Sequence, residues 1–362
     1  ALTGIIAVGW FLIGYYTKAE FLQTGYPDWI YHAFRIRDIQ QYGIASWDHV
    51  WSNGLNHWRA FQYVEHVLTL LVVNIAHLSI THAMLWVSVV SFVAIRVLIY
   101  TILRFLSINR MVSFFATIIS YDFSQQWIAL KDFSIYVAFV LVPLYLLLWT
   151  ITLRDKETRF IYVLAAITGA SWSVHPVVGY SFSGMLALLV LANNVKRKMW
   201  RLFGVGIVFF VSSLPFTVPY LFSSGYSISN PIFVTPQFLK DTILSEYFGL
   251  SLFFIILFGL SWAVLLLKSA ESPRWAKILL FYCTAYLIFI YFGQEGYYPS
   301  FVNKFQFSRA IPLIAFLAVF CFAAFLQTMF FSVKSRMVSV VLCVLTAVSV
   351  SHSIQVASLY TG

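Results

Sequence analysis

Long apolar runs separated by short polar stretches dominate the chain. Eleven of them lie near 2–16, 82–105, 111–121, 133–152, 160–174, 177–193, 202–222, 244–267, 278–292, 310–332 and 337–357. A helix needs roughly 20 apolar residues to cross a hydrocarbon layer of about 30 Å. The pattern therefore predicts an all-α polytopic membrane protein with about 11 transmembrane helices (roughly 10–13). They would form a single transmembrane domain over 1–362, without a soluble domain.

The stretch 61–78 differs from these runs because polar residues interrupt it. Gln62, His66, Thr69 and His77 fall near one helical face, which predicts an amphipathic helix at the membrane interface. The alternative is a twelfth span. Basic residues favour the first prediction, because Lys and Arg prefer cytoplasmic ends. If 61–78 does not span, all the basic clusters fall on one side; they lie at 104–110, 154–159, 196–201, 268–277 and 334–336.

The composition supports a membrane protein. Hydrophobic residues make up 61% of the chain and charged residues 10%, whereas a soluble domain carries about 25% charge. This excludes a soluble core with a polar shell. The net charge of +10 is interpreted as a report on orientation, so no nucleic-acid partner is expected. Cys283, Cys321 and Cys343 lie inside apolar runs, without disulfide or metal-ligand spacing.

This topology places most acidic residues on the outer side. The long outer segments are 17–60, 122–132, 223–243 and 293–309, and the first is the longest. A long ordered loop on a helical scaffold is often functional. We therefore expect the function to be displayed on the outer face.

The segment 17–60 contains the first candidate site. Asp28 and His32 are four residues apart and Arg35 follows three later, so on a helix starting near Pro27 they share one face. Asp28 would lie in the first turn, where the helix dipole favours a negative charge. The simpler interpretation is that Asp28 is only an N-terminal helix acid.

Four further residues are candidates. Asp48 follows Trp47 in an aromatic setting that is typical of an interfacial belt and also of sugar stacking. His175 precedes a proline at the outer end of a span, where it would cap a helix or bind a phosphate or hydroxyl. Lys304 and Arg309 are cations in the last outer segment; they would snorkel to the interface or bind an anion such as a lipid phosphate.

Charges inside the spans are few. No acid lies at the centre of a predicted span, and Arg96 is the one basic residue singled out within a span, where it would pair with a polar neighbour. Intramembrane acids mark proton pathways, so the pattern does not favour a proton-driven pump.

Several of these residues belong to a series of four features along residues 1–330. The features are an acid and a His four later (Asp28, His32), a Trp-Asp and Gly downstream (Trp47, Asp48, Gly54), a Ser-x-His step (Ser173 to His175), and a Gln-Phe…Arg entry into a late span (Gln306, Phe307, Arg309). With them the chain resembles the GT-C superfamily of integral membrane glycosyltransferases, which use lipid-phosphate-linked sugars. The closest likeness is to the prokaryotic membrane proteins labelled 6-pyruvoyl-tetrahydropterin-synthase-related. It departs from the family at Ser308, which separates Phe307 from Arg309.

The resemblance implies an inverting transfer of a sugar, from a polyprenyl-phosphate-linked donor to an acceptor, at the outer face of a prokaryotic plasma membrane. Asp28 would be the general base, with His32 as a second catalytic residue. Substrate and phosphate would be bound by Arg309, Lys304, His175, Asp48 and Gln306. Asp122 and Asp132 would supply a second acid or oxygen ligands for Mg²⁺ or Mn²⁺, although no cofactor is required by the resemblance.

Two other functions fit the same topology. One is a non-catalytic subunit or scaffold of the same fold, with a protein partner in a larger membrane complex. The other is a lipid or solute transporter. The lack of an internal repeat and of mid-membrane acids makes the transporter the weaker alternative.

Overall fold

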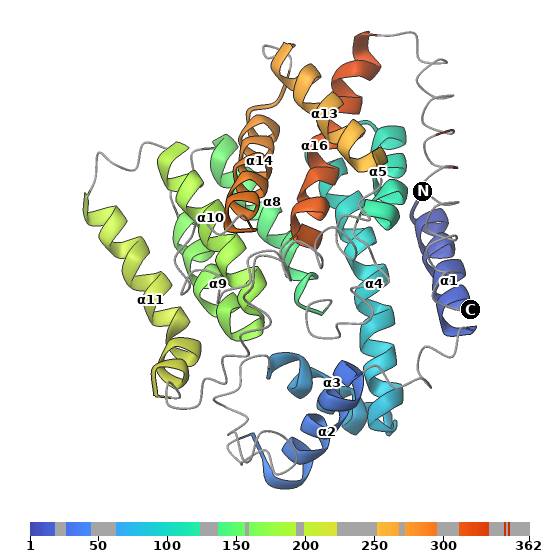
Figure 1. The fold of residues 1–362 in the computed structure, drawn as a ribbon, viewed down its shortest axis with the longest axis vertical. Helices are drawn as coiled ribbons and strands as arrows, with labels where there is room; N and C mark the ends of the chain where they lie inside the picture. Colours follow the sequence, from blue (N-terminus) through green and yellow to red (C-terminus); the bar gives the residue numbers. More distant parts are fainter. Residues whose placement is uncertain are drawn as a thin grey trace.

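The computed structural model describes residues 1–18, 27–44, 63–123, 137–155, 159–192, 199–222, 252–267, 272–294 and 311–332, with the single positions 344 and 347. Within these ranges the chain forms twelve helices and no strand, so the predicted all-α class is confirmed (Figure 1). The helices are α1 (Leu2–Lys18), α2 (Pro27–Tyr42), α3 (Val64–Ala76), α4 (Ile80–Phe105), α5 (Arg110–Phe123), α8 (Leu141–Asp155), α9 (Phe160–Val174), α10 (Pro176–Ala192), α11 (Met199–Phe222), α13 (Leu252–Leu267), α14 (Arg274–Gln294) and α16 (Ile311–Ser332).

The apolar runs account for most of these helices. Ten of the eleven predicted runs contain a described helix, and the run 337–357 lies outside the described residues apart from 344 and 347. One helix, Ile80–Phe105, is long and apolar enough to cross a membrane, with a mean hydropathy of 2.1 over its best window. The other apolar stretches found within the described helices, such as Trp200–Pro215 in α11 and Leu313–Met329 in α16, count 10–17 residues. The total of about 11 spans therefore stays a prediction.

The long helix α4 is the centre of the right-hand part of the structure in Figure 1. It contacts α1, α2, α3, α5 and α8. Its first turn is capped by Ser79, whose hydroxyl accepts a hydrogen bond from the backbone N–H of His82. Farther along, α16 packs against α5, α13 and α14, and α9 packs against α10 and α11. The fully buried rings of Phe92, Trp149 and Phe316 belong to the apolar core that joins these helices.

The helices α9 and α11 approach each other closely at one glycine. A Cβ added at Gly169 would lie 2.1 Å from Oγ of Ser212 and 2.4 Å from the carbonyl oxygen of Phe209. Only a residue without a side chain fits there, as is common where small residues let membrane helices pack backbone to backbone. Gly169 therefore determines how closely the outermost of these helices can dock.

A buried arginine of α4 contacts aromatic rings of two other helices, α5 and α16. Arg96 of α4 is fully buried, and its guanidinium carbon lies 4.8 Å from the ring centroid of Phe92, 5.0 Å from that of Tyr121 and 5.6 Å from that of Phe316. Aromatic faces attract a guanidinium, most strongly where water is excluded. Tyr121 also donates a hydrogen bond from its hydroxyl to the carbonyl oxygen of Ile5 in α1 at 2.9 Å. The rings therefore surround the charge that the sequence places inside a span.

Hydrogen bonds also link the turn between α4 and α5 to α16, α16 to α14, and α14 to α10. The backbone N–H of Asn109, between α4 and α5, donates to Oε1 of Gln327 in α16 at 2.8 Å. The thiol of Cys321 in α16 lies 3.8 Å from the carbonyl oxygen of Ala276 in α14. Arg274 of α14 donates to the carbonyl oxygen of the last residue of α10 at 2.9 Å.

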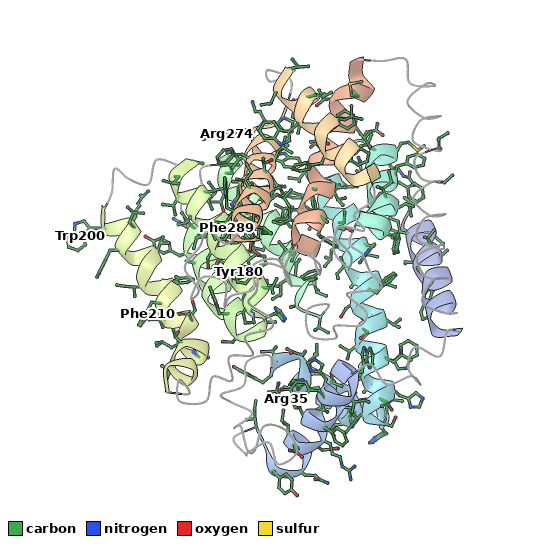
Figure 2. All side chains as sticks on the ribbon, viewed as in Figure 1. Arg35, Tyr180, Trp200, Phe210, Arg274 and Phe289 are labelled. Carbon is green, nitrogen blue, oxygen red and sulfur yellow. The ribbon has the colours of Figure 1, made fainter. Side chains whose placement is uncertain are left out.

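The helices α2 and α3 lie at the other side. They pack near the first turns of α4, a helix of 26 residues that is about 39 Å long at 1.5 Å per residue. Figure 2 shows Arg35 of α2 and Arg274 of α14 near opposite ends of the molecule. The basic residues at the ends of α4, α5 and α14 are thus far from α2 and α3.

Candidate functional site

The helix α2 begins where the sequence predicts it. Pro27 is its first residue, a position where the missing backbone N–H costs nothing and the fixed φ favours the helix. Asp28 occupies the first turn and His32 the second, so the two are one turn apart on the backbone. The side chain of Asp28 lies outside the described residues.

One face of α2 is buried, and it is strongly polar. His32 is 4% exposed, Arg35 2% and Asp38 6%, beside the fully buried Ile36. Polar groups of this kind are buried only where partners compensate them. The opposite face exposes Ile30 and other residues to the surroundings. The helix therefore directs the side chains of His32, Arg35 and Asp38 toward the interior.

The buried face of α2 meets an equally polar face of α3. Glu65, His66 and Thr69 are fully buried, and Nδ1 of His32 lies 2.7 Å from Nε2 of His66. The two imidazole rings have centroids 5.0 Å apart and planes tilted by 39°. The rings are therefore joined edge to edge by one hydrogen bond between two helices that are 34 residues apart in sequence.

We call His32, Arg35, Asp38, Glu65 and His66 the α2–α3 polar cluster. Each of the five is buried, and α2 contacts α3. It contains one permanent cation, two carboxyl groups and the imidazole pair. The guanidinium of Arg35 also lies 5.3 Å from the ring centroid of Tyr31.

Burial controls the charge of His32. Burial, and secondly the positive charge of Arg35, lower the pKa of His32 from its ordinary 6.5 to about 3. His32 is therefore neutral near pH 7. One ring of the pair donates an N–H and the other accepts it, according to their tautomers. A hydrogen bond of this kind can orient the two helices and neighbouring groups.

The polarity of α3 is inverted relative to a helix of a soluble protein. Glu65, His66 and Thr69 face inward, while Leu68, Leu71 and Ile75 are 41%, 51% and 79% exposed. The helix has 13 residues and is about 20 Å long, shorter than the roughly 30 Å hydrocarbon core. An exposed apolar face on so short a helix suits the boundary of a lipid layer.

The polar residues predicted to share one face of 61–78 separate in the structure. His66 and Thr69 are buried, whereas His77 is exposed and ends α3 in a left-handed conformation with φ 54°. Gln62 lies outside the described residues. His77 is separated from His66 and Thr69 because the helix ends at His77, so this residue does not continue their helical face.

His175 has the capping contact expected of a histidine at a helix boundary. It is 2% exposed between α9 and α10. Its Nδ1 accepts a hydrogen bond from the backbone N–H of Val177 at 3.1 Å, and its own N–H donates to the carbonyl oxygen of Ser171. One residue thus satisfies backbone groups at the end of α9 and the start of α10.

The remaining predicted site residues lie outside the described part of the chain. This holds for Asp48, Asp132, Lys304, Gln306 and Arg309. Asp122 lies in the last turn of α5, but its side chain is not described. Of the predicted site residues, His32 is the one whose described side chain lies in the α2–α3 polar cluster.

Sequence reasoning did not assign Asp38, Glu65 or His66 to the site. The available signal was the polar face of 61–78. Such a face can turn toward water or pack against another polar helix, and only the first possibility was considered. Among the described side chains, no group of three His, Cys, Asp or Glu residues could hold a metal ion. The Mg²⁺ or Mn²⁺ site suggested for Asp122 and Asp132 stays a prediction.

Comparison with known proteins adds no relative. No protein-family model, no curated protein and no solved structure matches the chain. The resemblance to GT-C glycosyltransferases therefore rests on the residues and topology given above.

Proposed function

We propose that the chain is an integral membrane glycosyltransferase that moves a sugar from a polyprenyl-phosphate-linked donor to an acceptor. One observation carries the proposal: the helix that begins with Pro27 and Asp28 is held by a buried polar cluster at the end of α4 opposite Arg274. An acid at the start of an anchored helix suits a general base, because catalysis requires accurate positioning.

The proposed reaction is a single displacement with inversion at the anomeric carbon. Asp28 accepts the proton of an acceptor hydroxyl as its oxygen forms a bond to the anomeric carbon. The bond from that carbon to the phosphate oxygen breaks, and polyprenyl phosphate leaves with the electron pair. Negative charge grows on the phosphate, and Arg309 and Lys304 are the cations proposed to stabilise it. His175, Asp48 and Gln306 are proposed to contact the substrates.

The proposed location is a prokaryotic plasma membrane, with the basic helix ends in the cytoplasm and α2 and α3 at the outer face. Three features support this placement: the apolar length of α4, the exposed apolar face of α3, and the separation of Arg274 from Arg35 along the molecule. Basic residues are retained on the cytoplasmic side. A polyprenyl-phosphate donor would meet α2 and α3 from the outer leaflet.

The decisive experiment is Asp28→Asn in purified protein reconstituted into liposomes with polyprenyl-phosphate-linked hexoses and pentoses. Loss of a general base costs about 10²–10⁴-fold in rate, so we expect transfer to fall by at least about 100-fold while the protein still folds. The matched control is Asp155→Asn at the last residue of α8, which should transfer sugar like the wild type. Retained transfer by Asp28→Asn removes Asp28 from the mechanism.

A non-catalytic membrane subunit is the second candidate. It is favoured by the outward face of α11, where Trp200, Phe203 and Phe210 are 85%, 63% and 58% exposed (Figure 2). A face of large aromatic residues suits a partner helix as well as lipid. Co-purification of a stable partner, together with an unchanged phenotype of Asp28→Asn, would favour this candidate over the transferase.

A further inference from the structure

Within the α2–α3 polar cluster, a hydrogen bond between the imidazole rings of His32 and His66 joins the two helices. We propose that His66 is a positioning residue that holds the first turns of α2, and with them Asp28, through this bond. The inference rests on the proposed function for the role of Asp28. The placement of α2 itself can be tested without any activity.

The need for such a link follows from how helices are stabilised in proteins. The helix α2 has 16 residues, and most of the stability of a helix in a protein comes from tertiary packing and not from its intrinsic propensity. Its position therefore depends on contacts with other helices. Apolar contacts supply part of these: Ile36 packs with Met84 and Val87 of α4, and Trp29 packs against the same cluster.

Apolar packing alone leaves freedom to shift or rotate, because the hydrophobic effect has no direction. A hydrogen bond restricts distance and angle. The bond between Nδ1 of His32 and Nε2 of His66, at 2.7 Å, lies one helical turn from Asp28. A change in this bond is therefore expected to shift or rotate the first turns of α2, which apolar packing of Trp29 and Ile36 holds without fixing their orientation.

The burial of both rings makes the bond effective. His32 is 4% exposed and His66 fully buried, so water does not replace either partner at low cost. Removing one imidazole leaves the other buried in a site built for two. In this view His66 acts through His32 and has no direct part in the chemistry.

The kinetic test is a double-mutant cycle on the transfer reaction. We expect His66→Ala to lower kcat by about 10–100-fold, the effect of a displacement of about 1 Å at a catalytic group, with little change in KM. His32→Ala should have a similar effect. The double variant should be no slower than either single variant, because both break the same bond.

Two further variants separate positioning from general damage. Gln in place of His66 retains a polar atom near the position of Nε2, so His66→Gln should recover most of kcat. The matched control is His77→Asn, because His77 is exposed at the end of the same helix and Asn tolerates its left-handed conformation. Additive losses in the cycle, or equal losses in His66→Gln and His66→Ala, would overturn the positioning role.

A distance measurement tests the placement of α2 independently of the reaction. Nitroxide labels on Ile30 and Leu71, which are 46% and 51% exposed, report the distance between α2 and α3 by double electron–electron resonance in a cysteine-free background. We expect a narrow distribution in the otherwise unchanged protein and with His66→Gln, and a broad or shifted one with His66→Ala. Identical distributions in all three overturn the inference. Absence of sugar transfer by the wild type would instead refute the proposed function, and the distance result would still decide whether His66 positions α2.

Discussion

Acid should loosen α2 from α3, because the imidazole ring of His32 is buried in its neutral state. The perturbation is a change from pH 7 to pH 5. Burial and Arg35 lower the pKa of His32 to about 3, so folding with this ring buried excludes a proton that the unfolded segment binds. The charged neighbours on the two helices of the pair are Arg35 and Asp38 on α2 and Glu65 on α3.

The helix α4, which also packs against α2, adds little charge to the site. Its nearest titratable residue by position is His82, in the first turn of α4, which is exposed and contacts the hydroxyl of Ser79. The loss of stability on acidification is therefore expected to come from the buried ring of His32.

The magnitude follows from the two pKa values of His32. A group whose pKa is lower in the folded state stabilises the fold fully above its unfolded pKa, here 6.5, and loses that contribution as the pH falls toward about 3. Each pH unit inside this window costs about 1.4 kcal/mol. At pH 5 the loss is about 2 kcal/mol, which is about a 30-fold increase in the population of the opened state.

Hydrogen–deuterium exchange of the α2 amides in detergent is the assay. After correction for the intrinsic effect of pH on exchange, the amides of α2 should be about 30-fold less protected at pH 5 than at pH 7, while those of α10 should be unchanged. His32→Asn is the matched variant, since its amide lies near the position of Nδ1 and does not titrate. The same acid sensitivity in His32→Asn and wild type would refute the reasoning, because the effect would then not come from His32.

Two packing predictions concern other helices. Gly169→Ala should destabilise the protein by about 1–3 kcal/mol, because its Cβ would overlap Ser212. The control Gly206→Ala should be neutral or slightly stabilising, because nothing lies within 4 Å of the added atom. Thermal unfolding in detergent compares the two variants, and equal effects would contradict the close α9–α11 contact. Tyr121→Phe should lower the free energy of unfolding by about 1 kcal/mol, because the hydrogen bond to Ile5 is lost. Proteolysis of α1 should then be faster. An unchanged rate of proteolysis would show that this bond does not hold α1.

The helical elements were readable from the chain because their signal is local. The run 82–105 became α4, and the predicted helix start near Pro27 became the start of α2. In both cases the deciding property, an apolar run or a proline with an acid, lies within the element itself. The number of membrane spans did not follow as directly, since helix length depends on where packing ends each helix.

The candidate site was only partly readable. Asp28, His32 and Arg35 were placed on one face from spacing alone, and the structure buries His32 and Arg35 together on α2. The partner of His32 is His66, on a helix that was expected to turn its polar residues to water. Spacing within one helix carries no information about which face a second helix covers, so this contact could not be derived from the chain.

The amino-acid sequence by itself determined the all-α class, the apolar character of the helices and the position of Asp28 at the start of α2, since composition, hydrophobic runs and helix-start residues act over a few turns. Only the tertiary structure decided that Arg96 lies against the rings of Tyr121 in α5 and Phe316 in α16 and that His32 meets His66 across 34 residues. These contacts join helices that are distant in sequence. They depend on the packing of whole helix faces, which must fill space and pair buried polar groups at the same time.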